Sequence, residues 1–259
     1  MDTVAPLLQA QHVSKSFGGL NALSDVSLNI QRKEIFGLIG PNGAGKTTMF
    51  NVLTGLYSAS SGNILFNGHE LRGLAPHAVV KLGLARTFQN IRLFSNMTAL
   101  ENVMVGQHSH THAGVLGAVL RSPAVRAEEA AMRKRGKELL AIVGISSHAG
   151  SLAKHLSYGD QRRLEIARAL ATNPQLLALD EPAAGMNPSE RVLLQKLLER
   201  LSNELGITLL LIEHDVKLVM GLCHRVAVLD YGKKIAEGVP AQVQRDPCVI
   251  EAYLGGDIA

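Results

Sequence analysis

The sequence predicts an α/β fold with a parallel sheet, an antiparallel region near the N-terminus and a helical insertion. Short runs made almost wholly of Leu, Ile, Val and Ala, at 176–179 and 208–212, are typical of parallel strands buried on both faces. Polar residues interleave at 7–13 and 26–30, which indicates a half-solvated antiparallel sheet. From about residue 96 to 150 the sequence contains more charged residues and its pattern is typical of helices, which indicates the helical insertion.

Other elements follow from local patterns. Residues 34–39 form a compact apolar strand that runs directly into a glycine-rich loop. Asn67-Gly68 favours a type I′ turn, so the flanking residues should form a hairpin, and 230–232 suggests a second one. The remaining expected elements are strands at 64–66, 69–71, 84–88, 226–229 and 233–236, and helices at 124–143, 161–171 and 191–205.

Composition limits the class of protein. With 46% hydrophobic and 19% charged residues in 259, the chain should fold and bury a sizeable core. Its two cysteines form no CxxC pair and are expected to be reduced and buried. No apolar run is long enough to cross a bilayer, and no secretory signal is evident. If this protein acts at a membrane, it is therefore expected to do so through a partner protein. The net charge of +4 suits phosphate ligands or an anionic surface.

The strongest chemical signal is a match to the pattern G-x-x-x-x-G-K-[ST] between an expected strand and an expected helix. Glycines let backbone N–H groups surround a polyphosphate, and the helix that starts near Lys46 adds the positive end of its dipole. Lys46 would reach the β- and γ-phosphates, and the Thr47 hydroxyl would ligate Mg²⁺. The alternative is a glycine-rich turn with an exposed lysine. The expected phosphate-binding residues are Gly40, Pro41, Asn42, Gly43, Ala44, Gly45, Lys46, Thr47 and Thr48.

A second element ends in two acidic residues. Asp180 follows four apolar residues at the carboxyl end of a buried strand, where open α/β sheets place ligands. Asp180 would hold Mg²⁺, directly or through water, and Glu181 would orient and polarise the attacking water. The alternative is an ordinary strand that ends in an acidic turn.

The segment Leu156-Ser-Tyr-Gly-Asp-Gln161 resembles the LSGGQ signature of ATP-binding cassette (ABC) proteins and departs from it at Tyr158 and Asp160. The resemblance implies a P-loop NTPase with a RecA-like parallel core, which binds ATP and Mg²⁺ and dimerises around two nucleotides. Ser157 and Gly159 would then contact the γ-phosphate of ATP held by a second subunit. A single ABC ATPase domain over 1–259 is implied, with its core at 1–90 and 161–259 and its helical subdomain at about 91–160.

The same resemblance gives roles to three further residues. Gln89 fits the glutamine that senses Mg²⁺ and the nucleophilic water, and His214 fits the histidine that contacts the γ-phosphate. Phe17 fits the aromatic residue that stacks on adenine. Taken singly, each has a structural alternative: a solvated loop glutamine, a structural histidine and a core aromatic. Asn187 stands where the family usually carries an aspartate that communicates across the dimer.

Several segments together resemble the LivG-type ATPases of bacterial branched-chain amino acid importers, namely 156–159, 162–168, 181–188 and 249–254. The resemblance implies two permeases, a second ATPase (homo- or heterodimeric pairing is left open), an external binding protein and a place on the cytoplasmic face of the inner membrane. The solute could instead be another amino acid, an amide or urea.

Competing functions have weaker support. A DNA-repair or translation ATPase usually carries two cassettes or a coiled coil, a P-loop kinase leaves the signature unexplained, and a GTPase lacks NKxD. No basic tail suggests nucleic acid. His108, His110 and His112 alternate and could ligate a metal, although a solvated loop is the simpler interpretation. The run from Arg133 to Arg135 is expected to be a solvated helix face, with a lipid or permease contact as the alternative.

Overall fold

A computed structural model describes residues 5–107 and 123–254, which form two compact units. Within the described residues, the first unit comprises 5–86, 175–184 and 198–254, and the second comprises 87–107, 123–174 and 185–197. These ranges differ from the expected core (1–90 and 161–259) and helical subdomain (about 91–160), because residues 87–90, 161–174 and 185–197 belong to the second unit. That the whole chain is one ABC ATPase domain stays a prediction.

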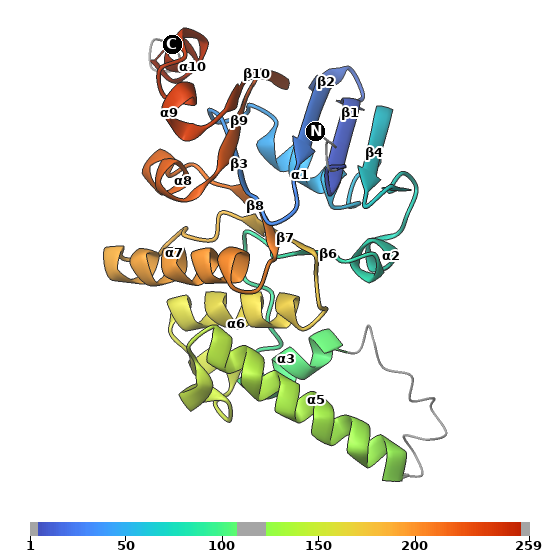
Figure 1. Ribbon diagram of the computed structural model, residues 1–259, viewed down its shortest axis with the longest axis vertical. Coiled ribbons are helices and arrows are strands. Elements are labelled where there is room, and N and C mark those ends of the chain that lie inside the picture. The colour runs from blue at the N-terminus through green and yellow to red at the C-terminus, as the bar shows by residue number, and fades with distance from the viewer. Residues whose placement is uncertain (1–4, 108–122, 255–259) are drawn as a thin grey trace. The chain divides into compact units, whose positions relative to one another are not determined.

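The first unit contains two sheets (Figure 1). The antiparallel sheet has the order β2-β1-β4-β5, and the second sheet has the order β10-β9-β3-β8-β7-β6. The strands are β1 (Leu8–Phe17), β2 (Leu20–Ile30), β3 (Ile35–Ile39), β4 (Ser61–Phe66), β5 (His69–Glu70), β6 (Leu84–Arg86), β7 (Leu176–Asp180), β8 (Thr208–Ile212), β9 (Arg225–Asp230) and β10 (Lys233–Gly238). The α/β fold with an antiparallel region is confirmed.

All neighbours in the second sheet pair in parallel except β10, which pairs with β9 in antiparallel. The strand β3 lies between β8 and β9, and β7 follows on the far side of β8. Since parallel strands point the same way, the loops that follow β3, β7, β8 and β9 all emerge at one edge of this sheet. This edge is where the candidate site of the first unit lies.

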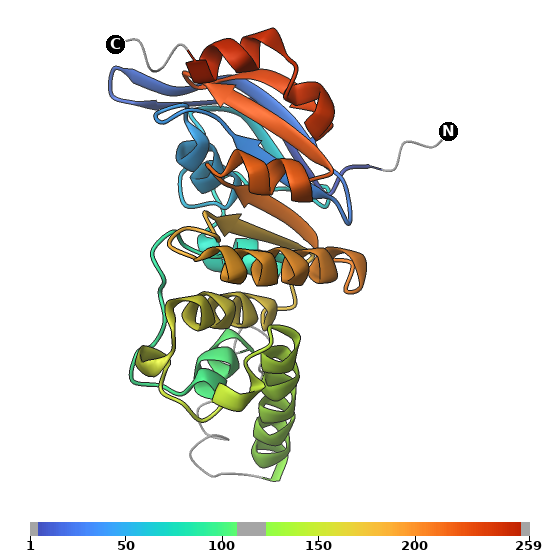
Figure 2. The ribbon, with the colours of Figure 1, turned by 90° about the vertical axis from the view of Figure 1, so that its left-hand side faces the viewer.

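The apolar core of the first unit forms around α1 (Lys46–Leu53). Its residues Met49, Phe50, Val52 and Leu53 are buried in one cluster with side chains of both sheets. On the opposite face of the second sheet lies α8 (Val216–Leu222), as two views at right angles show (Figure 1, Figure 2). The other helices of this unit are α2 (Pro76–Lys81), α9 (Pro240–Val243) and α10 (Pro247–Leu254).

The second unit is helical, as the sequence predicts. It contains α3 (Ala99–Gln107), α5 (Pro123–Ile142), α6 (Tyr158–Leu170) and two short 3₁₀ turns, Ser146–His148 and Ala153–His155. The helix α7 (Pro188–Asn203) begins in this unit and ends in the first. Gly106 of α3 permits a close approach to α6, because a Cβ atom there would lie 2.3 Å from the Arg168 carbonyl oxygen.

Both expected hairpins are present. Asn67 and Gly68 have φ of 50° and 80°, and Tyr231 and Gly232 have φ of 42° and 77°, as two consecutive left-handed residues require. The strand expected at 84–88 is shorter and ends at Arg86. One expectation is wrong: Cys223 is buried but Cys248 is exposed. Within the described residues, no helix is long and apolar enough to span a membrane.

We predict that Gly37→Val destabilises the protein. A Cβ atom at Gly37 would lie 2.8 Å from Val219 Cγ1 and 3.0 Å from Cys223 Sγ, so a larger side chain forces α8 away from β3. Overpacking of this kind costs about 1–3 kcal/mol of unfolding free energy. Chemical denaturation followed by circular dichroism measures it.

The matched control is Gly221→Ala in α8, the helix that packs against Gly37, because an added Cβ atom at Gly221 meets nothing within 4 Å. That variant should be more stable by about 0.5–1 kcal/mol, because alanine restricts the unfolded chain more than glycine. If Gly37→Val unfolds at the wild-type denaturant concentration, α8 does not pack against β3 as described.

Candidate functional site

The loop that joins β3 to α1 approaches its neighbours too closely for side chains at two positions. At Gly40, with φ of +152°, a Cβ atom would lie 2.1 Å from the Leu229 carbonyl oxygen. At Gly45, with φ of +98°, it would lie 2.7 Å from the Ala22 carbonyl oxygen. Gly45 is also the N-cap of α1, so the free backbone N–H groups of the first helical turn open onto this loop.

The side chain of Lys46 is buried inside the loop. It is 8% exposed, and its Nζ donates hydrogen bonds to the carbonyl oxygens of Gly40 (2.7 Å) and Pro41 (2.8 Å). Burial lowers the pKa of Lys46 below its ordinary value, and the charge of Glu181 acts in the opposite direction. An ammonium group is therefore held at the centre of a glycine-rich loop, next to a carboxylate.

A hollow of about 410 Å³ lies beside the loop. Residues 43–48 form one wall, and the aromatic side chains of Phe17 and Tyr231 are among the others. Phe17 is 44% exposed and makes an edge-to-face contact with Tyr57, with ring centroids 5.4 Å apart. Sequence reasoning missed Tyr231, although its place after β9 puts it at the same sheet edge as the loop.

Glu181 and His214 lie together because β7 and β8 are parallel neighbours with Asp180 opposite Ile212. The Glu181 N–H donates to the Ile212 carbonyl oxygen (2.9 Å), and Glu181 has a left-handed φ of 45°. His214 Nδ1 lies 3.6 Å from Glu181 Oε2, close enough for an ion pair when the histidine is protonated. Asp180, which precedes Glu181, is buried at the end of β7.

A third acidic residue, Glu213, follows β8 and binds the segment after Glu181. Asp180, Glu181, Glu213 and His214 are together called the acidic corner. Its Oε1 accepts a hydrogen bond from the Ala183 N–H (2.9 Å), and the side chain is buried. Burial raises the pKa of Glu213 above its ordinary value, and the hydrogen bond from Ala183 opposes that shift. Sequence reasoning passed over Glu213, because a polar residue next to a histidine carries no motif of its own.

In the second unit, Ser157 caps the helix that carries the signature-like segment. The Asp160 N–H donates to Ser157 Oγ (3.2 Å), and Ser157 Oγ donates to Asp160 Oδ2 (2.8 Å). Asp160 also pairs with Arg163 at 2.7 Å. A carboxylate in the first turn interacts favourably with the helix dipole, so the departure from LSGGQ at Asp160 helps to start α6.

The other two departures from the family pattern also make contacts within this unit. Tyr158 lies over Gly185, where a Cβ atom would be 3.2 Å from the Tyr158 ring. Asn187 caps α7: its Oδ1 accepts from the Glu190 N–H (3.0 Å), and Glu190 Oε2 accepts from the Asn187 N–H (3.0 Å). Glu190 also lies against Gly159, where a Cβ atom would be only 2.6 Å from Glu190 Oε1.

The predicted site residues are thus divided between the two units. Phe17, the loop at 40–48, Asp180, Glu181 and His214 belong to the first. Gln89, Ser157 and Gly159 belong to the second. Gln89 is held through its main chain, since its carbonyl oxygen accepts a hydrogen bond of 2.7 Å from Arg162 Nη2.

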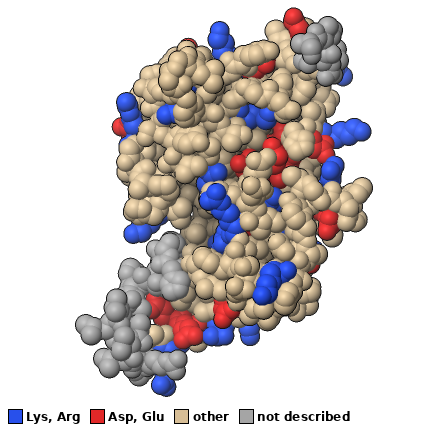
Figure 3. All heavy atoms as spheres, turned by 180° about the vertical axis from the view of Figure 1, so that it is seen from behind, with Lys and Arg blue, Asp and Glu red and all other residues tan. Residues whose placement is uncertain are grey.

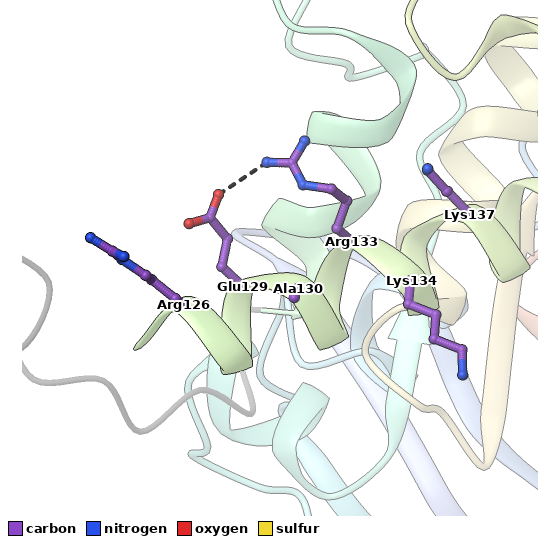
Figure 4. A pocket seen from close by; sticks show the side chains of 6 residues that line it. All are labelled: Arg126, Glu129, Ala130, Arg133, Lys134 and Lys137. Carbon is purple, nitrogen blue, oxygen red and sulfur yellow. Dashed lines mark hydrogen bonds and ion pairs between the residues drawn. The ribbon is translucent and has the colours of Figure 1, made fainter. Parts of the chain in front are cut away.

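Two other candidate sites from the sequence have different outcomes. His108, His110 and His112 lie outside the described residues. Residues 5–107 and 123–254, which the structure describes, contain no group of three His, Cys, Asp or Glu that could hold a metal ion. On α5, Arg133 and Arg135 are exposed and pair with Glu129 (3.0 Å) and Glu138 (3.3 Å) of the same helix. Figure 4 shows that Arg133 and three other basic side chains of α5 line a surface hollow, with Arg133 reaching toward Glu129; the other three are Arg126, Lys134 and Lys137. The prediction of a solvated helix face is confirmed.

The geometry of the first unit fits a bound polyphosphate. A buried ammonium, the open N-terminus of α1 and glycines that admit close backbone approach are the groups that cradle phosphate oxygens. The exposed Thr47 hydroxyl and the Asp180 carboxylate are hard oxygen donors of the kind that Mg²⁺ prefers. The charge of Glu181 acts on Lys46 of the loop, and the His214 imidazole lies 3.6 Å from that carboxylate, an arrangement that suits activation of water beside a phosphate.

Comparison with known proteins agrees with this chemistry. Residues 23–184 match the family described as "ABC transporter", and residues 233–259 match "Branched-chain amino acid ATP-binding cassette transporter". The chain is 46% identical to LivG of Salmonella typhimurium, a high-affinity branched-chain amino acid transport ATP-binding protein, over 96% of this chain and 98% of the relative. BraF of Pseudomonas aeruginosa, a protein of the same description, is 45% identical over the same shares.

Solved structures show the same fold. The ADP conformation of MJ1267, an ATP-binding cassette of an ABC transporter, has a TM-score of 0.84 and 32% identity, covering 97% of this chain and all of that one. A dimeric post-hydrolysis state of the cassette MJ0796, bound to ADP and Pi, has a TM-score of 0.76 and 28% identity, covering 90% and 98%.

Fold, loop and acidic corner together define a nucleotide-binding P-loop ATPase, and the chain belongs to the ABC transporter family. Within that family it is a transport ATP-binding subunit of the type that LivG and BraF represent. The family resemblance seen in the sequence is confirmed, and so is the expectation of an ABC-type ATPase. A kinase and a GTPase are thereby excluded.

We predict that Glu213→Gln changes how stability depends on pH. Because the pKa of Glu213 is raised in the folded state, the folded protein holds this proton more tightly than the unfolded chain does. This contribution is complete below the carboxyl's unfolded pKa and is lost as the pH rises through the raised folded pKa. Each unit by which folding raises a pKa corresponds to about 1.4 kcal/mol.

The unfolding free energy of Glu213→Gln relative to wild type, measured by chemical denaturation, should therefore increase as the pH rises above the ordinary carboxyl pKa and through the raised one. Glu204→Gln removes the carboxylate of an exposed ion pair with Arg200 and is the control for the loss of a surface charge. A difference between Glu213→Gln and wild type that stays constant with pH would mean that Glu213 is not buried as a carboxyl with a raised pKa.

Proposed function

We propose that this chain is the ATP-hydrolysing subunit of an importer of branched-chain amino acids and that it acts as one of a pair of ATPases. The observation that carries the proposal is full-length likeness to transport ATP-binding proteins of that description, combined with a tail match to the branched-chain amino acid cassette family. A lipopolysaccharide export relative, LptB of Haemophilus influenzae, is 36% identical, well below the 46% of LivG.

In this proposal the loop of the first unit binds ATP. Lys46 and the N–H groups of residues 42–48 hold the phosphates, and Phe17 stacks on adenine in the adjoining hollow. The Tyr231 ring, which lines the same hollow, offers a second aromatic surface for the base. Thr47, Asp180 and Gln89 are proposed to hold Mg²⁺, which when bound would neutralise charge that develops on the phosphates.

Hydrolysis is assigned to the acidic corner. Glu181 would orient and polarise the water that attacks the γ-phosphate, and Gln89 would help to position it. His214, 3.6 Å from Glu181, would donate to the γ-phosphate and hold the carboxylate in place. The roles of Lys46 and Glu181 are complementary, because one neutralises the phosphate charge and the other activates the nucleophile.

The signature-like segment is proposed to act across a dimer. Ser157 and Gly159, at the start of α6, would contact the γ-phosphate held by the second ATPase. The dimeric structures of MJ0796 support an assembly of this kind. We further propose that two permeases and a periplasmic solute-binding protein complete the transporter, and that the chain docks on the cytoplasmic face of the inner membrane.

A role in DNA repair or translation has less support. The relatives described above are transport ATP-binding proteins. Figure 3 shows one face of the molecule, on which Lys and Arg appear as separate groups among uncharged atoms in the part that the structure describes. On this face, that distribution does not favour a nucleic-acid surface.

We predict that Glu181→Gln binds ATP with wild-type affinity but hydrolyses it at least roughly a hundredfold more slowly, as expected when the group that activates water is lost. The variant should accumulate as an ATP-bound dimer, which size-exclusion chromatography with ATP detects. Lys46→Ala is the contrasting variant, because it should weaken ATP binding itself in a calorimetric titration. Full turnover by Glu181→Gln, or unchanged affinity in Lys46→Ala, would refute the corresponding assignment.

We predict that deleting the gene from its host lowers the initial rate of leucine, isoleucine and valine uptake. A plasmid copy of the wild type should restore the rate, and Glu181→Gln, which should still assemble, should not. Uptake of radiolabelled urea and of an aliphatic amide in the same cells serves as the comparison. If only urea or amide uptake falls, the ATPase assignment survives and the proposed solute is wrong.

A further inference from the structure

The second unit contains an arginine that is fully buried and whose contacts reach the main chain around Gln89. The side chain of Arg162 is 0% exposed. Its Nη1 donates to the Phe88 carbonyl oxygen and its Nη2 to the Gln89 carbonyl oxygen, each at 2.7 Å. One guanidinium thus binds two consecutive carbonyl groups through two different nitrogen atoms, whose directions are fixed by its plane.

Glu165, one turn further along α6, also binds the main chain around Gln89, through amide groups rather than carbonyl groups. It pairs with Arg162 at 2.9 Å and is 1% exposed. Its Oε1 accepts from the N–H groups of Phe88 and Arg92, both at 3.4 Å. Arg162 and Glu165 together therefore satisfy carbonyl and amide groups on both sides of Gln89.

The far end of this segment is fixed as well. Asn102 of α3 is fully buried, and its Oδ1 accepts from the Phe94 N–H (2.9 Å) while its Nδ2 donates to the Phe94 carbonyl oxygen (3.0 Å). The guanidinium of Arg168, also on α6, lies 5.8 Å from the Phe94 ring centroid. Residues 88–94 are thus attached at both ends to the helices of the second unit.

The pair contributes position rather than much net stability. Removing two charges from water costs several kcal/mol each, and the attraction between them does little more than offset that cost. Burial accordingly raises the pKa of Glu165, against the influence of Arg162. What the pair supplies instead is direction: the guanidinium plane sets where the Phe88 and Gln89 carbonyls can lie.

We propose that Arg162 and Glu165 are positioning residues that fix the Gln89 main chain to the helix begun by Ser157. Gln89 and Ser157 then form one rigid body, so that phosphate contact at Ser157 and placement of the Gln89 amide occur together. This inference rests on the proposed role of Gln89 in holding Mg²⁺ and water. Neither positioning residue is expected to touch nucleotide.

The test compares two Arg→Lys variants in the purified full chain. Arg162→Lys keeps the charge beside Glu165 but loses the plane of two nitrogen atoms that sets the directions of the two carbonyls. Arg133→Lys makes the same change in an exposed Arg–Glu pair of α5 and is the control. The measured quantities are kcat, the Mg²⁺ concentration that gives half the maximal rate, and ATP affinity without Mg²⁺.

Arg162→Lys should lower kcat roughly tenfold, since small misplacements of catalytic groups have effects of this size or larger. It should raise the Mg²⁺ requirement severalfold and leave Mg²⁺-free ATP affinity unchanged, because the Lys46 loop is not altered. Arg133→Lys should match wild type in all three. If Arg162→Lys behaves like Arg133→Lys, the inference is overturned.

A double-variant cycle separates this inference from the role of Gln89 itself. Gln89→Ala should lower kcat, and adding Arg162→Lys should lower it little further, because both changes remove the same placement. Fully additive effects would overturn the positioning role while leaving that of Gln89 intact. Wild-type turnover by Gln89→Ala would instead remove the premise and the inference together.

If Arg162→Lys does not fold, Arg162→Met/Glu165→Leu replaces the buried pair with apolar side chains of similar size, a change that proteins often tolerate. It releases the same carbonyls without leaving a lone buried charge. The expected result is again a lower kcat and a higher Mg²⁺ requirement, with ATP affinity unchanged. Wild-type kinetics in a folded double variant would overturn the proposal.

Discussion

The parallel pairing of β3, β7, β8 and β9 is the constraint on which the first unit depends. Parallel strands expose their carboxyl ends at one edge, so the phosphate loop, the acidic pair and His214 meet there although they lie far apart in the sequence. The loop also lies very close to the neighbouring strand. A Cβ atom at Gly40 would lie 2.1 Å from the Leu229 carbonyl oxygen near the end of β9, so the sheet itself requires glycine at this position, whether or not a ligand is bound.

Much of this arrangement could be predicted from the sequence. Apolar strands such as 208–212 were found because parallel strands buried on both faces leave an unbroken hydrophobic run. The phosphate loop was found because its glycines and lysine have fixed spacing. Tyr231 and Glu213 could not be found in this way, since their places come from strand order and burial, and a single sequence does not encode either one locally.

The departures from the family pattern acquire a physical explanation from contacts that no motif describes. Tyr158 covers a glycine, Asp160 joins the cap of α6, and Asn187 forms a reciprocal cap with Glu190. Each is a local partner within the second unit. Sequence reasoning recognised the departures but could not say what they contact, because the partners are set by how α6 and α7 begin.

The bonds that Lys46 makes to its own loop have a consequence for ligand binding. Its ammonium carries three N–H donors, of which two already have carbonyl acceptors, so one donor is left for an anion. The two bonds hold the ammonium in one position before any ligand arrives, so little side-chain freedom remains to be lost on binding. An anion at the loop would therefore meet a charge that is already in place, beside the open N-terminus of α1.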